Sequence, residues 1–65
     1  MKILVNGAWR EIERAELAGA LEELGYGASA VSTAVNGEFV AAALRARTVL
    51  TEGDRIEVLA PMQGG

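Results

Sequence analysis

Only one stretch of this chain repeats apolar residues at the spacing of an α-helix, and it constrains the whole architecture. Four apolar residues recur at intervals of three and four, which places them on one helix face: Leu17, Ala20, Leu21 and Leu24. We expect a helix over residues 15–24 that ends at Gly25, because glycine favours the left-handed conformation that closes a helix. A lone amphipathic helix needs another kind of layer to cover its stripe, and a small sheet is the economical choice.

Short runs rich in β-branched residues surround this helix and predict the strands of that sheet. We expect strands over residues 2–5, 8–12, 31–35 and 55–59, an extended segment over 38–40 and a brief strand over 48–50. Asn6-Gly7 and Asn36-Gly37 predict tight hairpin turns, because both residue types tolerate positive φ. Residues 41–46 favour one short helical turn.

The alternation of apolar residues within the strands predicts the core and the order of the sheet. We expect five residues from three strands to face the core: Ile3, Val5, Ile12, Ile56 and Val58. Because the first and last strands are both apolar, a parallel pairing of the two at the sheet centre is favoured. The predicted fold is therefore α+β and of the ubiquitin-like β-grasp type, a small mixed sheet with one main helix packed on one face.

Length and composition limit the chain to a single small domain and exclude most kinds of chemistry. The 65 residues predict a β-grasp domain over 1–60 and a flexible C-terminal tail over 61–65, because Pro61 cannot donate to a strand ladder. The absence of Cys and His removes the thiol nucleophile, the imidazole base and the usual transition-metal ligands. We therefore expect no catalytic residues, no metal site and no enzyme activity of its own.

Charge and hydropathy limit the kinds of partner that the chain is expected to bind and predict where in the cell it is located. The net charge of −3 argues against nucleic acid and favours protein partners. The apolar run at the start of the chain is too short for a signal peptide or a membrane span, so we expect a cytoplasmic protein with no membrane partner.

The last two residues, Gly64 and Gly65, carry the main functional signal. Glycine has no Cβ, so this end of the chain passes through a slot too narrow for other residues. A carboxylate on Gly65 is then accessible to the active site of another enzyme. The alternative is a frayed tail that happens to consist of glycine.

Three motifs in order resemble those of the thiamine-biosynthesis sulfur carrier family, ThiS. They are the V-N-G-E turn of residues 35–38, the L-x-x-G-D turn of residues 50–54 with its following apolar strand, and the terminal Gly64-Gly65. Each turn alone is common, but the combination at this spacing is specific and covers nearly the whole chain.

The resemblance implies a mechanism in which the chain is acted upon. An E1-like adenylyltransferase of the ThiF type would use ATP to adenylate the Gly65 carboxylate, with Gly64, Gln63 and Met62 threaded into its active site. Sulfur taken from cysteine by a desulfurase would replace AMP and give a thiocarboxylate. A thiazole synthase of the ThiG type would accept that sulfur, and the carrier itself would bind no cofactor.

Three other functions stay open at this point. The small subunit of molybdopterin synthase has the same fold and the same thiocarboxylate, a ubiquitin-like modifier would form isopeptide bonds instead, and a structural domain would have an inert tail.

For partner docking we propose Leu59, which alternates with the core residues of the last strand, and Phe39. We expect Trp9 to be half-buried and structural, and Arg45 and Arg47 to be solvated.

Overall fold

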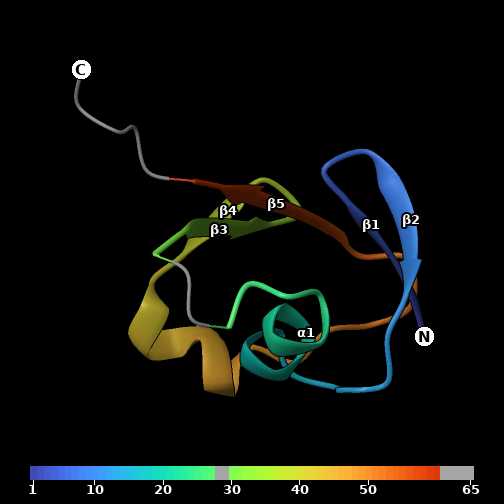
Figure 1. The fold of residues 1–65 in the computed structure, drawn as a ribbon, viewed down its shortest axis with the longest axis horizontal. Helices are drawn as coiled ribbons and strands as arrows, with labels where there is room; N and C mark the ends of the chain where they lie inside the picture. The colour runs from blue at the N-terminus through green and yellow to red at the C-terminus, as the bar shows by residue number, and fades with distance from the viewer. Residues whose placement is uncertain (28–29, 61–65) are drawn as a thin grey trace.

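The computed structural model describes residues 1–27 and 30–60, and it contains a five-stranded mixed sheet with one main helix (Figure 1). The elements in chain order are β1 (Lys2–Val5), β2 (Ala8–Glu11), α1 (Leu17–Glu23), β3 (Ser32–Val35), β4 (Glu38–Val40), the 3-10 helix η1 (Ala42–Arg47) and β5 (Arg55–Leu59). The strands lie in the order β2-β1-β5-β3-β4, with β1 parallel to β5 and the other neighbours antiparallel. The β-grasp arrangement and the parallel pairing of the first and last strands are confirmed.

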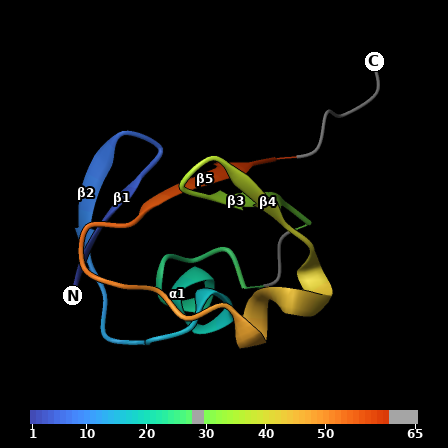
Figure 2. The same cartoon turned by 180° about the vertical axis from the view of Figure 1, so that it is seen from behind.

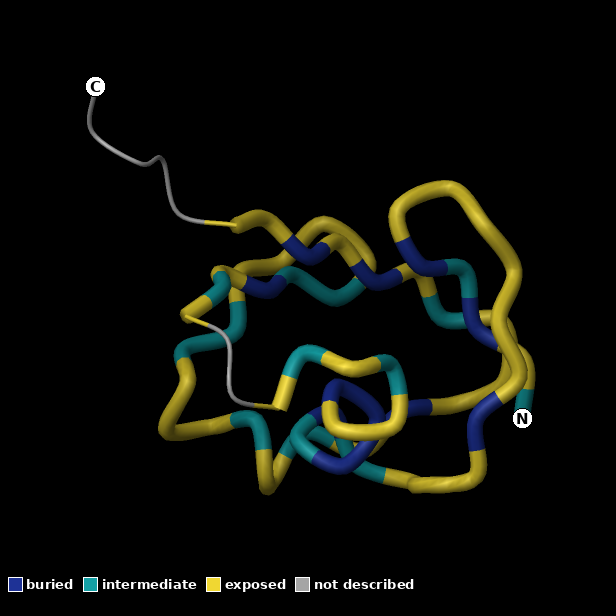
Figure 3. The backbone as a smooth tube through the Cα atoms, viewed as in Figure 1, coloured by how far each residue is buried: buried dark blue, intermediate teal, exposed yellow. Residues whose placement is uncertain are grey.

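The core lies between the sheet and α1. Both views place α1 and η1 on the same side of the sheet (Figures 1 and 2). The buried apolar residues come from the sheet, the helix and two connections: Ile3, Val5, Ile12, Leu17, Ala20, Leu21, Leu50, Ile56 and Val58. All five core residues expected from strand alternation are among them. Buried and exposed segments alternate along β5, as a strand with only one covered face requires (Figure 3).

The helix begins later than the sequence predicts. Residues 15–24 were expected to be helical, but α1 starts at Leu17 and Glu16 is extended. The Leu17 N–H donates to the Thr48 carbonyl and the Leu50 N–H donates to the Ala15 carbonyl, each at 2.8 Å. These bonds pair the residues just before the helix with the distant segment 48–50. The extended conformation that this pairing requires replaces the helical one that the local sequence favours.

Residues 48–50 were expected to form a brief strand and do not. Val49 forms only an isolated bridge with Glu16. The short helical turn expected over residues 41–46 is present as η1, one residue later. Among the described residues, neither helix is long and apolar enough to cross a membrane.

Both predicted hairpin turns are confirmed by their backbone angles. Asn6 and Asn36 have φ of 49° and 50°, and the glycines that follow them are also positive. This conformation is the one that a two-residue turn requires to follow the twist of its strands. The two turns join β1 to β2 and β3 to β4.

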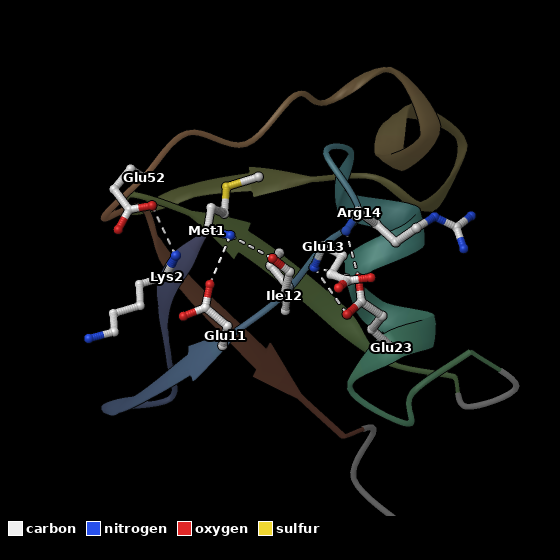
Figure 4. Close-up of polar contacts among 8 residues, drawn as sticks. All are labelled: Met1, Lys2, Glu11, Ile12, Glu13, Arg14, Glu23 and Glu52. Carbon is white, nitrogen blue, oxygen red and sulfur yellow. Dashed lines mark hydrogen bonds and ion pairs between the residues drawn. The ribbon is translucent and has the colours of Figure 1, made fainter.

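The connection between β2 and α1 is fastened by charged groups at both ends (Figure 4). The carboxylate of Glu23, at the end of α1, accepts hydrogen bonds from the N–H groups of Glu13 and Arg14. The N-terminal ammonium donates to the Ile12 carbonyl at 2.6 Å and pairs with the Glu11 carboxylate at 3.1 Å. These contacts fix the position of the helix relative to the first hairpin, although the N-cap of the helix makes no side-chain hydrogen bond.

Arg45 is not the solvated residue that the sequence predicts. Its Nε donates to the Thr33 hydroxyl at 3.1 Å, and its guanidinium also donates to the Val31 carbonyl. Thr33 is only 2 % exposed, and its hydroxyl donates to the Val40 carbonyl at 2.9 Å. Arg45 thus joins η1 to the β3–β4 hairpin, whereas Arg47 is exposed as expected.

Candidate functional site: the open face of the sheet

The face of the sheet opposite α1 presents alternate residues of every strand. In β5 these are Arg55, Glu57 and Leu59, because Ile56 and Val58 point into the core. The strand pairings extend this face sideways in three rows: Trp9–Leu4–Arg55, Phe39–Ala34–Glu57 and Ser32–Leu59. Within the described residues, no helix covers these rows.

Leu59 and Phe39, the two docking candidates, both lie on this open face. Their exposed fractions of 66 % and 72 % are large for apolar side chains. They line one hollow of about 110 Å³ together with Ser32, Thr33, Ala34 and Glu57. That volume is small beside the ~300–1,000 Å³ of small-molecule sites, so the hollow suits one side chain of a protein partner.

Trp9 belongs to the same face, which the sequence reasoning missed. It is 60 % exposed, so the expectation of a half-buried structural residue is wrong. The signal was available in the two-residue turn at Asn6-Gly7. Such a turn pairs Leu4 with Trp9, and paired residues share a face, so Trp9 lies opposite the core residues of β1.

The charges on this face are mixed in sign. Arg55 and Glu57 lie on the same face of β5 as Leu59, so apolar side chains are bordered by both a cation and an anion. Exposed apolar residues within a polar border are typical of surfaces that bind proteins. Lys2 and Glu11 form a further opposed pair at the far edge of the face.

Asp54 precedes β5 and, among the titratable groups of the described residues, is the one with a clear pKa shift. The Thr51 N–H donates to its carboxylate at 2.9 Å, and the Asn36 amide donates at 3.1 Å. These hydrogen bonds favour the charged form and lower the pKa of Asp54 from its ordinary value of 3.8. Asp54 stabilises the turn that leads into β5 and is not placed for chemistry.

The end of the chain, where the sequence predicts the chemistry, is not among the described residues. The tail residues named from the sequence, Met62, Gln63, Gly64 and Gly65, lie outside the described residues, as does Pro61. Ala60 follows Leu59 directly, so the chain leaves the sheet next to the hollow. Among residues 1–27 and 30–60, no group of three acidic side chains gathers as a metal site would require.

A larger hollow of about 300 Å³ lies between α1 and η1. Its polar side chains include Glu22, Tyr26 and Arg45. Arg45 is engaged with β3, and Glu22 pairs with Arg14 at 3.8 Å. The open face remains the better candidate because it adjoins the end of β5.

Comparison with known proteins finds a matching family model and a similar solved structure. The family model described as ThiS family matches residues 3–65, which includes both terminal glycines. Among solved structures, the crystal structure of a thiamine biosynthesis protein (ThiS) from Geobacter metallireducens is similar, with a TM-score of 0.82 and 29 % identity over 100 % of each chain. No curated protein sequence matches.

Proposed function

This chain belongs to the ThiS family, and we propose that it is a sulfur carrier protein of thiamine biosynthesis rather than an enzyme. One observation carries the proposal: the family match extends over residues 3–65 and so includes the terminal Gly64-Gly65. The similar solved structure is that of a thiamine biosynthesis protein, which favours the thiazole pathway over the molybdopterin alternative.

The proposed chemistry takes place at the carbonyl carbon of Gly65. A carboxylate oxygen attacks the α-phosphorus of ATP on an activating enzyme, and pyrophosphate leaves. The terminal sulfur of a persulfide, formed from cysteine by a desulfurase, then attacks the carbonyl carbon and AMP leaves. A thiol reductant cleaves the resulting acyl disulfide, which releases the thiocarboxylate and leaves a disulfide on the reductant side; free hydrosulfide would displace AMP and give the thiocarboxylate directly. The adenylate is needed because an unactivated carboxylate has no good leaving group, and splitting the step lowers each barrier.

Two partners follow from this chemistry, an E1-like adenylyltransferase and a thiazole synthase. We propose that both recognise the open face through Leu59 and Phe39, with Trp9 as a third apolar anchor. Shared use of one face makes the two complexes mutually exclusive, so the carrier has to leave the first enzyme before the second binds. ATP belongs to the activating enzyme, and the carrier holds no cofactor.

The proposal is tested by adding one residue after Gly65. The extended protein has its carboxylate displaced by one peptide unit and should not be adenylated, because small misplacements of reacting atoms are costly. Its melting temperature should match that of the original chain, since the core is built from residues 3–58. Gly64→Ala adds only a methyl group and should slow loading with the same unchanged stability.

Normal sulfur loading of the extended protein, with the extra residue confirmed in place by mass, would refute the terminal-carboxylate mechanism. An unstable extended protein would show that the added residue disturbs the fold, and Gly64→Ala would then decide the question.

A further inference from the structure

Strand β5 extends further than its parallel neighbour. β1 ends at Val5, opposite Ile56, and the chain then turns away at Asn6 with a φ of 49°. The Asn6 N–H still donates to the Ile56 carbonyl at 3.0 Å. Beyond this bond, no further residue of β1 pairs with Val58.

The side chain of Asn6 takes the place of the missing strand residue. Its Nδ2 donates to the Val58 carbonyl at 3.0 Å, and its Oδ1 accepts the Val58 N–H at 2.8 Å. A side-chain amide has the same donor and acceptor as a peptide unit, so Asn6 continues the β1–β5 ladder by one position. Both bonds are partly buried, which raises the cost of losing them.

The second hairpin turn provides a natural comparison at the opposite end of β5. Asn36 has nearly the same φ, 50°, and its Oδ1 accepts the Arg55 N–H at 2.9 Å. Its Nδ2 donates to the Asp54 carboxylate at 3.1 Å. Two equivalent Asn-Gly turns therefore hold β5, one where the strand begins and one where it ends.

We propose that Asn6 is a positioning residue for the sulfur-carrier reaction, fixing the point at which the ordered strand ends and the reactive end of the chain begins. This inference rests on the proposed function. Leu59 follows Val58 directly, so the contact that Asn6 makes lies one residue from the docking surface and seven residues from Gly65.

The physical reason is that β5 has support on two sides only as far as Asn6 reaches. Without the Asn6 amide, Val58 would be paired on one side only, with Thr33 of β3, as Leu59 already is with Ser32. The end of the strand would then separate from the sheet more often. A carrier docked through the rest of the open face would deliver its carboxylate with less defined geometry, which lowers the rate of the reaction more than the affinity.

The experiment compares Asn6→Gly with Asn36→Gly in the full chain. Glycine accepts positive φ, so both turns are retained and each variant loses two side-chain hydrogen bonds to the segment 54–58. The added unfolded-state entropy of glycine is the same in both. Asn6→Asp serves as a second variant. It keeps an acceptor for the Val58 N–H, but it replaces the donor by a carboxylate oxygen that repels the Val58 carbonyl.

Two measurements separate positioning from general stability. Hydrogen exchange of the Val58 amide should be at least about tenfold faster in Asn6→Gly and nearly unchanged in Asn36→Gly. With the cognate activating enzyme, kcat for adenylation should fall about tenfold in Asn6→Gly while KM for the carrier changes less than about threefold. Asn36→Gly should keep both constants. Asn6→Asp should also lower kcat, because its carboxylate cannot donate to the Val58 carbonyl.

Each outcome decides the matter. Equal slowing by the two glycine variants, or no slowing by Asn6→Gly, would overturn the role of Asn6 and leave the carrier function standing. If the original chain is itself not adenylated, the proposed function fails and this inference fails with it. If Asn6→Gly does not fold, an Asn6→Asp variant with unchanged kcat would overturn the inference.

Discussion

Replacing Leu21 by alanine should remove a large part of the stability of the domain. Leu21 lies on α1, is only 4 % exposed and packs in the core cluster between the helix and the sheet. A buried Leu→Ala change costs about 2–5 kcal/mol, which combines the lost transfer free energy with the cavity that is left. The helix is short, so it has few other residues with which to fill that space.

The magnitude matters because the chain is small. At about 0.05–0.15 kcal/mol per residue, 65 residues give a free energy of unfolding of roughly 3–10 kcal/mol. The loss of Leu21 therefore removes about a fifth of that stability or more. Urea denaturation followed by circular dichroism should show a lower midpoint with an unchanged m value, because the fold and its buried surface are otherwise retained.

Leu44 is the matched control within the same chain. It has the same side chain but is 52 % exposed on η1, so Leu44→Ala should cost less than about 1 kcal/mol. A change within about 0.5 kcal/mol for Leu21→Ala, or equal losses for the two variants, would refute the placement of the helix stripe against the sheet.

Three further changes test other parts of the account. The lowered pKa of Asp54 means that its contribution is present above pH 3.8 and is lost as the pH falls through the folded-state pKa, so the stability advantage over Asp54→Asn should shrink in that range in acid titrations. Thr33→Val leaves Arg45 without its hydroxyl acceptor and should cost ~1–3 kcal/mol in urea melts; equal or greater stability would show that this buried contact contributes nothing. Leu59→Asp should weaken binding to both partner enzymes at least about tenfold by calorimetry with unchanged melting. If neither complex is impaired, the docking surface lies elsewhere.

The features that could be predicted from the sequence are those determined by short-range rules. The Asn6-Gly7 turn requires positive φ at two successive residues, and only a few residue types supply it. Ile56 and Val58 alternate with charged residues, so the buried face of β5 follows directly from the pattern. The parallel pairing of β1 with β5 could be predicted because both strands are apolar and need neighbours on each side.

The features that were missed depend on contacts between distant residues. Ala15 and Glu16 have local helical preference, but their backbone pairs with the segment 48–50, more than thirty positions away. Arg45 reads as a surface charge until the fold brings the Thr33 hydroxyl beside it. Trp9 could have been placed correctly from the hairpin register alone.

The candidate site also has features that were expected from the sequence and one that could not have been. The docking role of Leu59 and Phe39 stays a prediction, although the structure shows both side chains exposed on one face. The Asn6–Val58 contact was not predictable, because it joins residues 52 positions apart. In addition, the positive φ of the turn is already a sufficient reason for an asparagine at position 6.

The central claim is that Gly65 carries sulfur on its terminal carbonyl carbon, and intact mass tests it most directly. The carrier is incubated with ATP, sulfide and the cognate activating enzyme, and fragmentation locates any change in mass. The account predicts that one oxygen is replaced by sulfur and that the change maps to Gly65. An unchanged mass with an activating enzyme proven active, or a sulfur atom located on any other residue, would contradict it.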